Sequence, residues 1–310
     1  MTVSVCMGLY NGAKYIEEQL YSILNQTKKP DEVILCDDVS TDETVKIVEN
    51  FICSNHLEEN WKIYRNKVNK GYPANFYHAC RLCTKNIVFL ADQDDIWHSQ
   101  KIESMCNVFE EQEEAKVVCC KFDLIDSDGK DIHTVMAPTR SGESNRLKKI
   151  AMEDIFYKNE YPGMVIAYRN DWGKDWLPDC SKIPHDFLIC IRAAEEKNFL
   201  QLDRVLAYHR RHNANAGGEE HRIKKLLDKK RKIQEIETYL RMLRSFEEEQ
   251  ILQTSEGWEA LEKKLRSMEG RYESLQSGKV GKVIKNAWKY RKNVRLTTVV
   301  CDVVIVGKGM

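Results

Sequence analysis

The sequence predicts an α/β fold, with a mainly parallel sheet and flanking helices, followed by a helical C-terminal region. Up to about residue 115, short apolar runs alternate with segments of helical periodicity. This alternation is typical of parallel strands joined by right-handed crossovers. Beyond residue 219, apolar residues recur at steps of three and four, which indicates helices. The chain of 310 residues is 42% hydrophobic, which is enough for a globular core.

The elements are expected in a regular order in the first half of the chain. Strands are predicted at residues 2–7, 32–36, 61–64 and 86–91, and helices at 14–26, 41–52, 73–83 and from about 98. The middle is less regular. It contains a predicted hairpin (117–126 with 131–135), a short strand (163–168), a helix (184–196) and a strand (199–208). Two further helices with a break near Gly257 predict an antiparallel helical hairpin.

Charge is distributed unevenly along the chain. Residues 219–310 hold 21 Lys and Arg against 14 Asp and Glu, whereas the first 218 residues hold 27 against 34. This asymmetry indicates that the C-terminal part has a different task. We therefore expect two domains, residues 1–218 and residues 219–310, the second formed by a helical hairpin and a basic tail.

Cysteines and apolar runs indicate the compartment. The eleven cysteines are scattered without the spacing of a disulfide framework, and Cys80-x-x-Cys83 has no second pair beside it. The first residues lead directly into a predicted strand without the pattern of a signal peptide, and no apolar run reaches the ~20 residues of a membrane span. We expect a cytoplasmic protein with free thiols and no nucleic-acid partner.

The most informative segment is Asp92-Gln93-Asp94-Asp95, which follows the strand expected at residues 86–91. Three carboxylates in four positions repel one another, and a divalent cation would relieve that repulsion. Their hard oxygen ligands suit Mg²⁺ or Mn²⁺ holding a diphosphate. The simpler interpretation is a charged turn that caps the next helix, although capping requires one Asp rather than three.

Polar residues also follow two other predicted strands, at Tyr10-Asn11 and Asp37-Asp38. Ligands of open parallel sheets collect beyond the carboxyl ends of the strands. We therefore expect these two pairs and the acidic segment to converge on one site.

Five motifs occur in the order of a known family. They are Val3-Ser4-Val5 with Tyr10-Asn11-Gly12, residues 33–42 around Asp37-Asp38-Val39-Ser40, Asn69-Lys70-Gly71, residues 92–97, and His185-Asp186. Together they resemble the family 2 glycosyltransferases of GT-A fold, especially the bacterial rhamnosyltransferase-like members, over residues 2–213.

The resemblance implies a set of donor-binding residues. Gly8 and Tyr10 would line the base pocket, and Asp38 would accept the N3–H of uracil or thymine. Asp92 and Asp94 correspond to the Asp-x-Asp motif of the family. Asp94 would bind Mn²⁺ or Mg²⁺ directly, and Asp92 would lie nearer the ribose or a metal-bound water.

Further positions match the general base and the basic stretch of the family. Asp186 would take the proton of the acceptor hydroxyl, which typically contributes ~10²–10⁴-fold in rate. The other interpretation of Asp186 is a carboxylate favoured by the dipole at a helix start. In the basic stretch, Arg211 would pair with phosphate oxygens and His212 would complete the metal shell, whereas a solvated basic strand end is the alternative.

The resemblance therefore implies an inverting, metal-dependent transfer from a nucleoside-diphosphate sugar, with dTDP-rhamnose or a UDP-hexose as donor. The acceptor would be a glycan or a lipid-linked saccharide in bacterial surface polysaccharide synthesis. We identify no second nucleophile for a double displacement. Two rival functions are a nucleotide-sugar pyrophosphorylase and a non-catalytic nucleotide-sugar-binding scaffold.

The C-terminal tail has a separate pattern. Residues 277–300 contain seven Lys and Arg and no acid, and a helical wheel places Val283, Ile284 and Trp288 on one side. A basic amphipathic helix with a tryptophan suits an anionic membrane surface. We expect peripheral attachment at the inner face of the plasma membrane, and a helix packed on its own domain or in a homodimer is the alternative.

Overall fold

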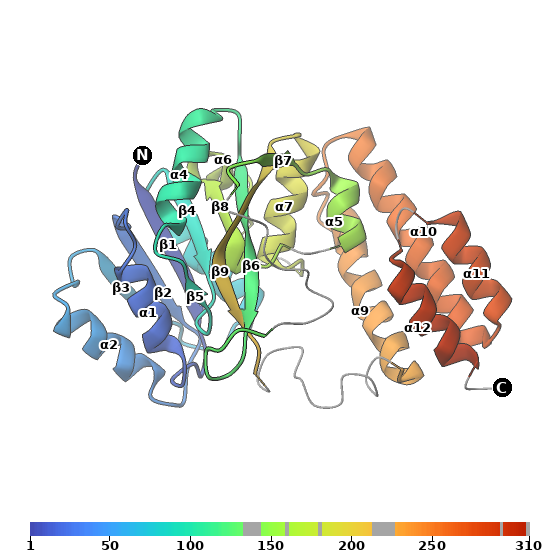
Figure 1. Ribbon diagram of the computed structural model, residues 1–310, viewed down its shortest axis with the longest axis horizontal. Helices are drawn as coiled ribbons and strands as arrows, with labels where there is room; N and C mark the ends of the chain where they lie inside the picture. Colours follow the sequence, from blue (N-terminus) through green and yellow to red (C-terminus); the bar gives the residue numbers. More distant parts are fainter. Residues whose placement is uncertain (133–143, 159–160, 179–181, 213–226, 292–293, 308–310) are drawn as a thin grey trace. The chain divides into compact units, whose positions relative to one another are not determined.

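The structure is a computed structural model that describes residues 1–132, 144–158, 161–178, 182–212, 227–291 and 294–307 (Figure 1). The chain forms two compact units. The sheet unit comprises residues 1–150 and 161–212, and the helical unit comprises residues 151–160 and 213–310. The predicted boundary at residue 218 lies outside the described residues and stays a prediction.

The sheet unit alternates strands and helices in its first half, as the sequence predicts. Its elements are β1 (Val3–Leu9), α1 (Ile16–Leu24), β2 (Glu32–Asp37), α2 (Thr44–Ser54), β3 (Trp61–Arg65), α3 (Tyr72–Leu82), β4 (Ile87–Ala91), β5 (Ile96–Trp97), α4 (Lys101–Glu111), β6 (Val117–Ile125), β7 (Leu147–Lys149), the 3₁₀ helix η1 (Gly163–Val165), β8 (Ile166–Arg169), α6 (Asn170–Lys174), α7 (His185–Glu195) and β9 (Phe199–Arg210).

One sheet contains all nine strands of the described chain, in the order β3-β2-β1-β4-β8-β6-β9-β5, with β7 paired to β9. The four strands β3, β2, β1 and β4 are parallel, whereas β8 pairs antiparallel with both β4 and β6. Helix α3 packs on β1 and β2, and α4 and α7 pack near β6 and β9. The predicted α/β fold is therefore confirmed, with parallel pairing among β3, β2, β1 and β4 and again between β6 and β9.

The strand order reverses at β1, because β2 and β3 lie on one side of it and β4 on the other. The ends of these strands are level, since Leu9 pairs with Asp37 and Met7 pairs with Ala91. All five residues of β4 are buried, as expected for a central strand covered on both faces. The three polar segments of the sequence therefore emerge side by side at the point where open α/β sheets bind ligands.

The helical unit consists of α5 (Met152–Lys158), α9 (Lys229–Glu248), α10 (Ser255–Ser277), α11 (Val280–Lys289) and α12 (Leu296–Gly307). Helix α10 packs against α9, α11, α12 and α5. The predicted helical hairpin corresponds to α9 and α10. None of the helices in the described ranges is long and apolar enough to cross a membrane.

Several local expectations need correction. Residues 163–165 form the 3₁₀ helix η1, and only Ile166–Arg169 form strand β8. The break between α9 and α10 lies before Gly257, whose backbone N–H is capped by the side chain of Thr254. The predicted 117–135 hairpin is present as far as Ile132, whose N–H donates to Leu124, and its remaining residues lie outside the described ranges. Every described cysteine is free.

Candidate active site

The segment after β4 is bound to the end of β1 through Gln93. Its side chain accepts a hydrogen bond from the Tyr10 N–H at 3.0 Å and donates one to the Tyr10 carbonyl at 2.9 Å. A Cβ at position 12 would lie 2.3 Å from Oε1 of Gln93, so any larger residue would displace the Gln93 amide. Gly12 therefore permits the contact that holds the acidic segment beside the first strand.

Asp92 lies among other carboxylates. Its side chain is half-buried, and its pKa is raised well above the usual range by burial and by the charges of Asp95, Asp94 and Asp186. Asp186 follows β4 by more than ninety residues in the chain, yet its charge acts on Asp92. The structure thus brings the predicted base close to the Asp-x-Asp motif, and a cation at this place would relieve the repulsion.

Asp94 contacts His212, which follows β9. Nε2 of His212 lies 2.8 Å from Oδ2 of Asp94, and the His212 ring packs on Tyr15 with its centroid 4.6 Å away. Burial and Asp95 raise the pKa of Asp94, while the contact with His212 lowers it. Two of the three predicted metal ligands therefore meet in space.

Asp95 has a different task from its two acidic neighbours. It is fully buried, and its Oδ1 accepts a hydrogen bond from the Arg210 N–H at 2.8 Å and lies 3.0 Å from Nδ1 of His209. The carboxylate therefore ties the acidic segment to strand β9. Sequence reasoning grouped all three acids together, because it had no indication that the third would face the neighbouring strand.

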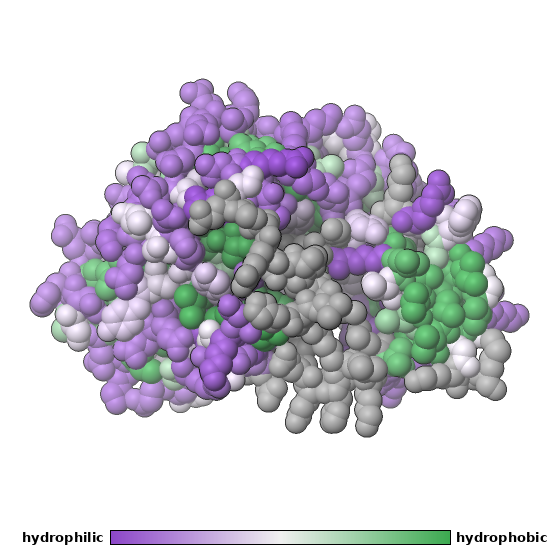
Figure 2. All heavy atoms as spheres, in the orientation of Figure 1, coloured by the Kyte–Doolittle hydropathy of each residue, from purple (hydrophilic) through white to green (hydrophobic). Residues whose placement is uncertain are grey.

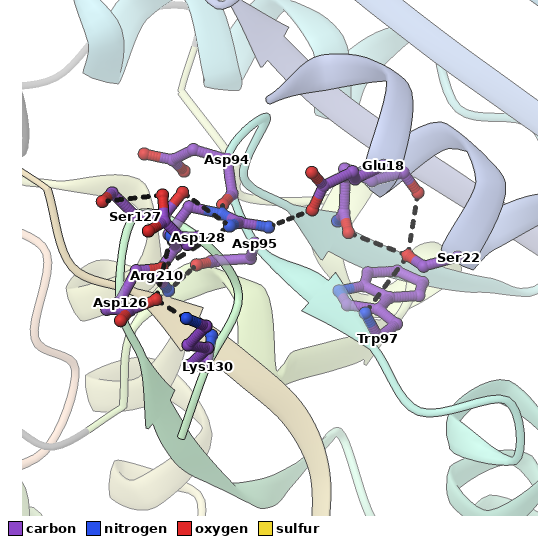
Figure 3. Close-up of polar contacts among 11 residues, drawn as sticks. Glu18, Ser22, Asp94, Asp95, Trp97, Asp126, Ser127, Asp128, Lys130 and Arg210 are labelled. Atoms are coloured by element: carbon purple, nitrogen blue, oxygen red, sulfur yellow. Dashed lines mark hydrogen bonds and ion pairs between the residues drawn. The ribbon is translucent and has the colours of Figure 1, made fainter. Parts of the chain in front are cut away.

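Arg210 also binds the acidic segment, through the carbonyl of Asp94. The sequence analysis singled out the neighbouring Arg211 and missed this residue. Figure 3 shows its side chain between Glu18 of α1 and the turn that follows β6. Its Nε donates to the Asp94 carbonyl at 2.8 Å, its Nη1 donates to the Ser127 carbonyl at 3.3 Å, and its Nη2 pairs with Glu18. This fully buried arginine positions the backbone of Asp94.

Asp38 is 3% exposed and binds the loop before α3. Its Oδ1 accepts hydrogen bonds from the Lys70 N–H at 2.8 Å and from Nδ2 of Asn66 at 2.9 Å, while its Oδ2 accepts from the Gly71 N–H at 2.9 Å. The next residue, Val39, has a φ of +67°, which a β-branched side chain rarely adopts. Asp38 therefore shapes this loop, whatever else it binds.

The predicted base-pocket residues Gly8 and Tyr10 lie at the end of β1. A Cβ at position 8 would lie 3.0 Å from the Phe76 ring and 3.3 Å from Nδ2 of Asn75, so glycine here allows α3 to pack closely. Tyr10 is exposed beyond the strand. The Asn75 side chain also donates to the Cys36 carbonyl at 2.7 Å, which fixes α3 against β2.

Asp186 lies in the first turn of α7, where its Oδ1 accepts a hydrogen bond from the Phe187 N–H at 2.8 Å. The preceding His185 is buried and stacks on Phe76 at 4.0 Å between centroids, and burial lowers its pKa to about 4. Its two ring nitrogens are buried without a hydrogen-bond partner. The buried, neutral His185 ring packed on Phe76 therefore holds the start of α7, and with it Asp186, in place.

Tyr72 at the start of α3 is a second residue that the sequence analysis did not identify. It is exposed, and the pKa of its hydroxyl is raised by burial of that group and by the charges of Asp186 and Asp92. Its ring also makes an edge contact with His185. An exposed aromatic ring near two carboxylates can pack on the apolar face of a sugar.

The predicted ligand set has the chemistry of a divalent cation site. Among the residues that the structure describes, no three His, Cys, Asp or Glu side chains form a complete metal site by themselves. Asp94 and His212 nevertheless supply one carboxylate and one imidazole, and Asp92 supplies further negative charge nearby. A carboxylate with an imidazole suits Mn²⁺, and a site with few protein ligands leaves positions for diphosphate oxygens. Arg211 precedes His212 in the chain, and its backbone N–H donates to the Ile125 carbonyl.

Comparison with known proteins identifies the family. The sequence model of Glycosyl transferase family 2 matches residues 4–167, which is more than half of the chain. The chain belongs to glycosyl transferase family 2. The family inferred from the ordered motifs is confirmed.

Two curated relatives illustrate the similarity. EpsE of Bacillus subtilis (strain 168) is 34% identical over 116 residues, which make up 37% of this chain and 41% of that protein. The dTDP-rhamnosyl transferase RfbG of Shigella flexneri is 38% identical over 108 residues, which make up 33% of this chain and 37% of that protein. The chain thus spans about two fifths of the length of these relatives.

Solved structures share the fold. TarS 1-349 of S. aureus in complex with UDP-GlcNAc aligns with a TM-score of 0.59 at 17% identity, over 100% of this chain and 91% of that one. The mannosyltransferase PcManGT from Pyrobaculum calidifontis, in complex with GDP-Man and Mn²⁺, aligns with a TM-score of 0.53 at 17% identity, over 99% and 86%. The expected GT-A fold is confirmed.

Proposed function

We propose that this family 2 protein transfers a sugar from a nucleoside-diphosphate sugar to a hydroxyl group of a glycan or a lipid-linked saccharide in bacterial surface polysaccharide synthesis. The observation that supports this most is the concentration of Asp92, Asp94 and Asp186 near the ends of β1 and β4. Carboxylates that lie this close repel one another, and such clusters are typical of sites that bind a cation or transfer a proton.

Asp94, His212 and Asp92 would hold Mn²⁺ or Mg²⁺ in this proposal. The bound cation would supply positive charge for the leaving diphosphate. The protein positions these ligands through Arg210, which donates to the Asp94 carbonyl, and through Gln93, whose side chain binds the backbone of Tyr10. Arg211 would add a second cation for the phosphate oxygens.

Asp186 would act as general base on the acceptor hydroxyl. Its carboxylate lies close enough to Asp92 for their charges to interact, and it directly follows the buried His185, so a proton acceptor stands beside the proposed metal ligands. One direct attack from the face opposite the leaving group inverts the anomeric carbon. The described residues offer no second nucleophile that we identify, so we propose the inverting course.

The nucleotide would bind along β1 and β2, with Tyr10 and Gly8 beside the base. Oδ2 of Asp38 accepts one hydrogen bond, from Gly71, so one lone pair is left for the N3–H of uracil or thymine. We propose dTDP-rhamnose or a UDP-hexose as donor. The similarity to a protein described as a dTDP-rhamnosyl transferase supports the former.

The exposed faces of α11 and α12 would attach the helical unit to the cytoplasmic face of the membrane. Ile284 and Trp288 are 54% and 75% exposed, whereas Val283 is buried and packs inward, so the predicted apolar face of α11 is divided. Figure 2 shows an apolar surface over α12, and Leu296 and Val300 of this helix are exposed. Helix α11 also carries Lys282, Lys285 and Lys289, and Lys292 lies outside the described residues. A dimer through this face is the alternative.

Donor turnover tests the proposal. Purified protein is incubated with a panel of nucleotide sugars and glycan acceptors, with Mn²⁺ or Mg²⁺, and release of nucleoside diphosphate is measured before and after EDTA. We expect acceptor-stimulated release that EDTA abolishes. Binding of the donor without release in any combination would favour a scaffold instead. Release of pyrophosphate from a nucleoside triphosphate and a sugar phosphate would favour a pyrophosphorylase.

A further inference from the structure

Tyr72 is a large aromatic residue that stays exposed beside the proposed general base. It is the first residue of α3 and is 59% exposed. Its ring makes an edge contact with the ring of His185, with 6.2 Å between the centroids and 72° between the planes. His185 begins α7 and directly precedes Asp186. Single exposed aromatic residues are ordinary on protein surfaces, so the place of this one is what distinguishes it.

The backbone that carries Tyr72 is fixed by its neighbours. The N–H groups of Lys70 and Gly71 donate to the Asp38 carboxylate at 2.8 Å and 2.9 Å. Gly71 has a φ of +80°, which glycine adopts at little cost, and Pro73 suits the first turn of α3 because its own φ is already close to the helical value. The ring is therefore presented from an ordered backbone, which lowers the entropic cost of binding a ligand to it.

Tyr72 is the exposed member of a cluster of aromatic rings. Phe76 lies four residues further along α3, on the same face of the helix, and stacks on His185 with 4.0 Å between the centroids and 9° between the planes. Phe76 and His185 are 6% and 2% exposed, so the inner part of the cluster belongs to the core. A ligand that packs on Tyr72 would therefore meet a ring that His185 already supports from the inner side.

Two carboxylates lie within electrostatic reach of the Tyr72 hydroxyl. Although the residue as a whole is exposed, burial of the hydroxyl, followed by the charges of Asp186 and Asp92, raises its pKa. Asp186 in turn raises the pKa of Asp92. Each of the three side chains is thus close to the other two, although they come from α3, α7 and the segment after β4. Both carboxylates are half-buried, so a ligand can reach them from solvent.

Gly163 at the start of η1 also borders the proposed base. A Cβ at this position would lie 3.2 Å from Nε2 of His185 and 3.9 Å from Cβ of Asp186. Any side chain there would press on the start of α7. Glycine therefore keeps a side chain away from Asp186 at this point, while Tyr72 supplies an exposed ring nearby.

We propose, on the basis of the sugar transfer proposed above, that Tyr72 packs on the sugar ring of the acceptor and holds its hydroxyl group beside Asp186. The acceptor is then a pyranose, because one face of such a ring consists largely of C–H bonds that pack on an aromatic ring, whereas an acyclic polyol has no such face. Tyr72 is thereby the residue that selects a carbohydrate acceptor. Its edge contact with His185 favours the acceptor side, and Tyr10 is already assigned to the nucleotide.

The test separates acceptor binding from donor binding in the full-length protein. Release of nucleoside diphosphate is measured at varied donor and acceptor concentrations, with the methyl pyranosides of rhamnose, glucose and galactose as acceptors and with ribitol and glycerol as acyclic controls. Tyr72→Ala should raise the KM for the pyranoside by about tenfold, while the donor KM and kcat change by less than about twofold. Tyr72→Phe keeps the ring and should stay within about threefold of the wild type. Tyr72→Leu replaces Tyr72→Ala if the alanine variant does not fold.

A matched control and a binding measurement accompany the kinetics. Tyr21→Ala removes another tyrosine of the sheet unit, 45% exposed, whose ring makes an edge contact with Phe51, and it should leave both KM values unchanged. Saturation-transfer NMR with UDP or dTDP present measures binding of the same pyranosides without turnover. Pyranoside binding that is lost in Tyr72→Ala supports the role of Tyr72 even if no donor is turned over. Failure of the wild type to turn over any donor contradicts the proposed transfer alone.

Several results would overturn the role of Tyr72 as an acceptor platform. A larger rise in the donor KM than in the acceptor KM would place the ring on the donor. A fall in kcat with an unchanged acceptor KM and an altered pH profile would mean that Tyr72 only supports His185 and Asp186. Equal losses in Tyr72→Phe and Tyr72→Ala would assign the effect to the hydroxyl group. The role is also excluded if no pyranoside binds to the wild type, if the acyclic polyols serve equally well, or if Tyr72→Ala binds the pyranosides as tightly as Tyr21→Ala.

Discussion

Nε2 of His212 lies 2.8 Å from Oδ2 of Asp94, although 118 residues separate the two in the chain. The contact joins the residue after β9 to the segment after β4. Because Asp94 and His212 come from distant parts of the chain, the pair forms only when the strands that carry them are assembled in the sheet. Any activity that requires both residues therefore depends on the long-range pairing of β9 with β5 and β6.

Replacing Asp94 with alanine should abolish metal-dependent turnover. The diphosphate would lose the ligand that brings its counter-charge, and losses of about 10²–10³-fold are typical when one such group is removed. Release of nucleoside diphosphate with Mn²⁺ measures the effect. Asp128→Asn, an exposed carboxylate on the turn after β6, is the matched control and should retain full activity. Unchanged turnover in Asp94→Ala would remove this residue from the site.

Asp186→Asn should slow transfer by roughly 10²–10⁴-fold while donor affinity stays nearly constant. The amide preserves shape but does not accept the acceptor proton. Asp171→Asn is a close control, because both carboxylates accept a hydrogen bond of 2.8 Å from the next backbone N–H at a helix start. Separate measurements of kcat and of donor binding check this. A large loss of donor affinity with normal kcat would assign Asp186 another task.

His185 should make stability depend on pH. Its folded pKa is lowered to about 4 from its ordinary 6.5 by burial, so the unfolded chain binds a proton in the range between these values and the folded protein does not. Stability contributed by the neutral ring is thus complete above pH 6.5 and is lost as pH falls to about 4, by up to about 3 kcal/mol. Urea unfolding of wild type and His185→Leu from pH 4 to pH 7 measures it. Equal pH slopes for the two proteins would contradict the prediction.

Val39→Gly should stabilise the protein by about 1 kcal/mol, because glycine adopts a φ of +67° without the steric cost that valine has. The Val39 side chain is exposed, so little buried surface is lost. Val68→Gly is the control, since Val68 is also exposed but is absent from the described residues with positive φ. Thermal unfolding compares the two, and a destabilised Val39→Gly would mean that the side chain is required.

Ile284→Ser combined with Trp288→Ser should reduce sedimentation with anionic vesicles. The pair removes the exposed apolar groups of α11 and leaves its lysines in place. Donor hydrolysis by the sheet unit should be unaffected. Val68→Ser, an exposed apolar residue of the sheet unit, is the control. Equal sedimentation of the double variant and the wild type would exclude attachment through this face.

Sequence patterns predicted the positions of the parallel strands because each has a local signal. The strands β1, β2, β3 and β4 each begin and end within two residues of the predicted bounds, and the acidic segment follows β4 as expected. A continuous apolar run between two helical segments indicates a strand that is buried on both faces.

The partners of the site residues were not predictable in the same way. Arg210 and Arg211 are adjacent in sequence, and only the alternation along β9 and its register with β6 decide which one turns toward the acidic segment. The burial of Asp38 against the loop at residues 69–71 depends likewise on contacts about thirty positions apart. Local periodicity contains no information about such pairings.

Helix α5 lies between two segments of the sheet unit in the chain, yet it packs with α10 of the helical unit. The polypeptide therefore enters the second folding unit, leaves it and returns. A protein cut at residue 212 would retain α5 but lose α10, which packs against it and whose Lys264 donates to the Phe156 carbonyl. A chimera that exchanges the helical unit between relatives would therefore have to include residues 151–160 as well. Exchange of residues 213–310 alone would leave α5 without the α10 against which it packs.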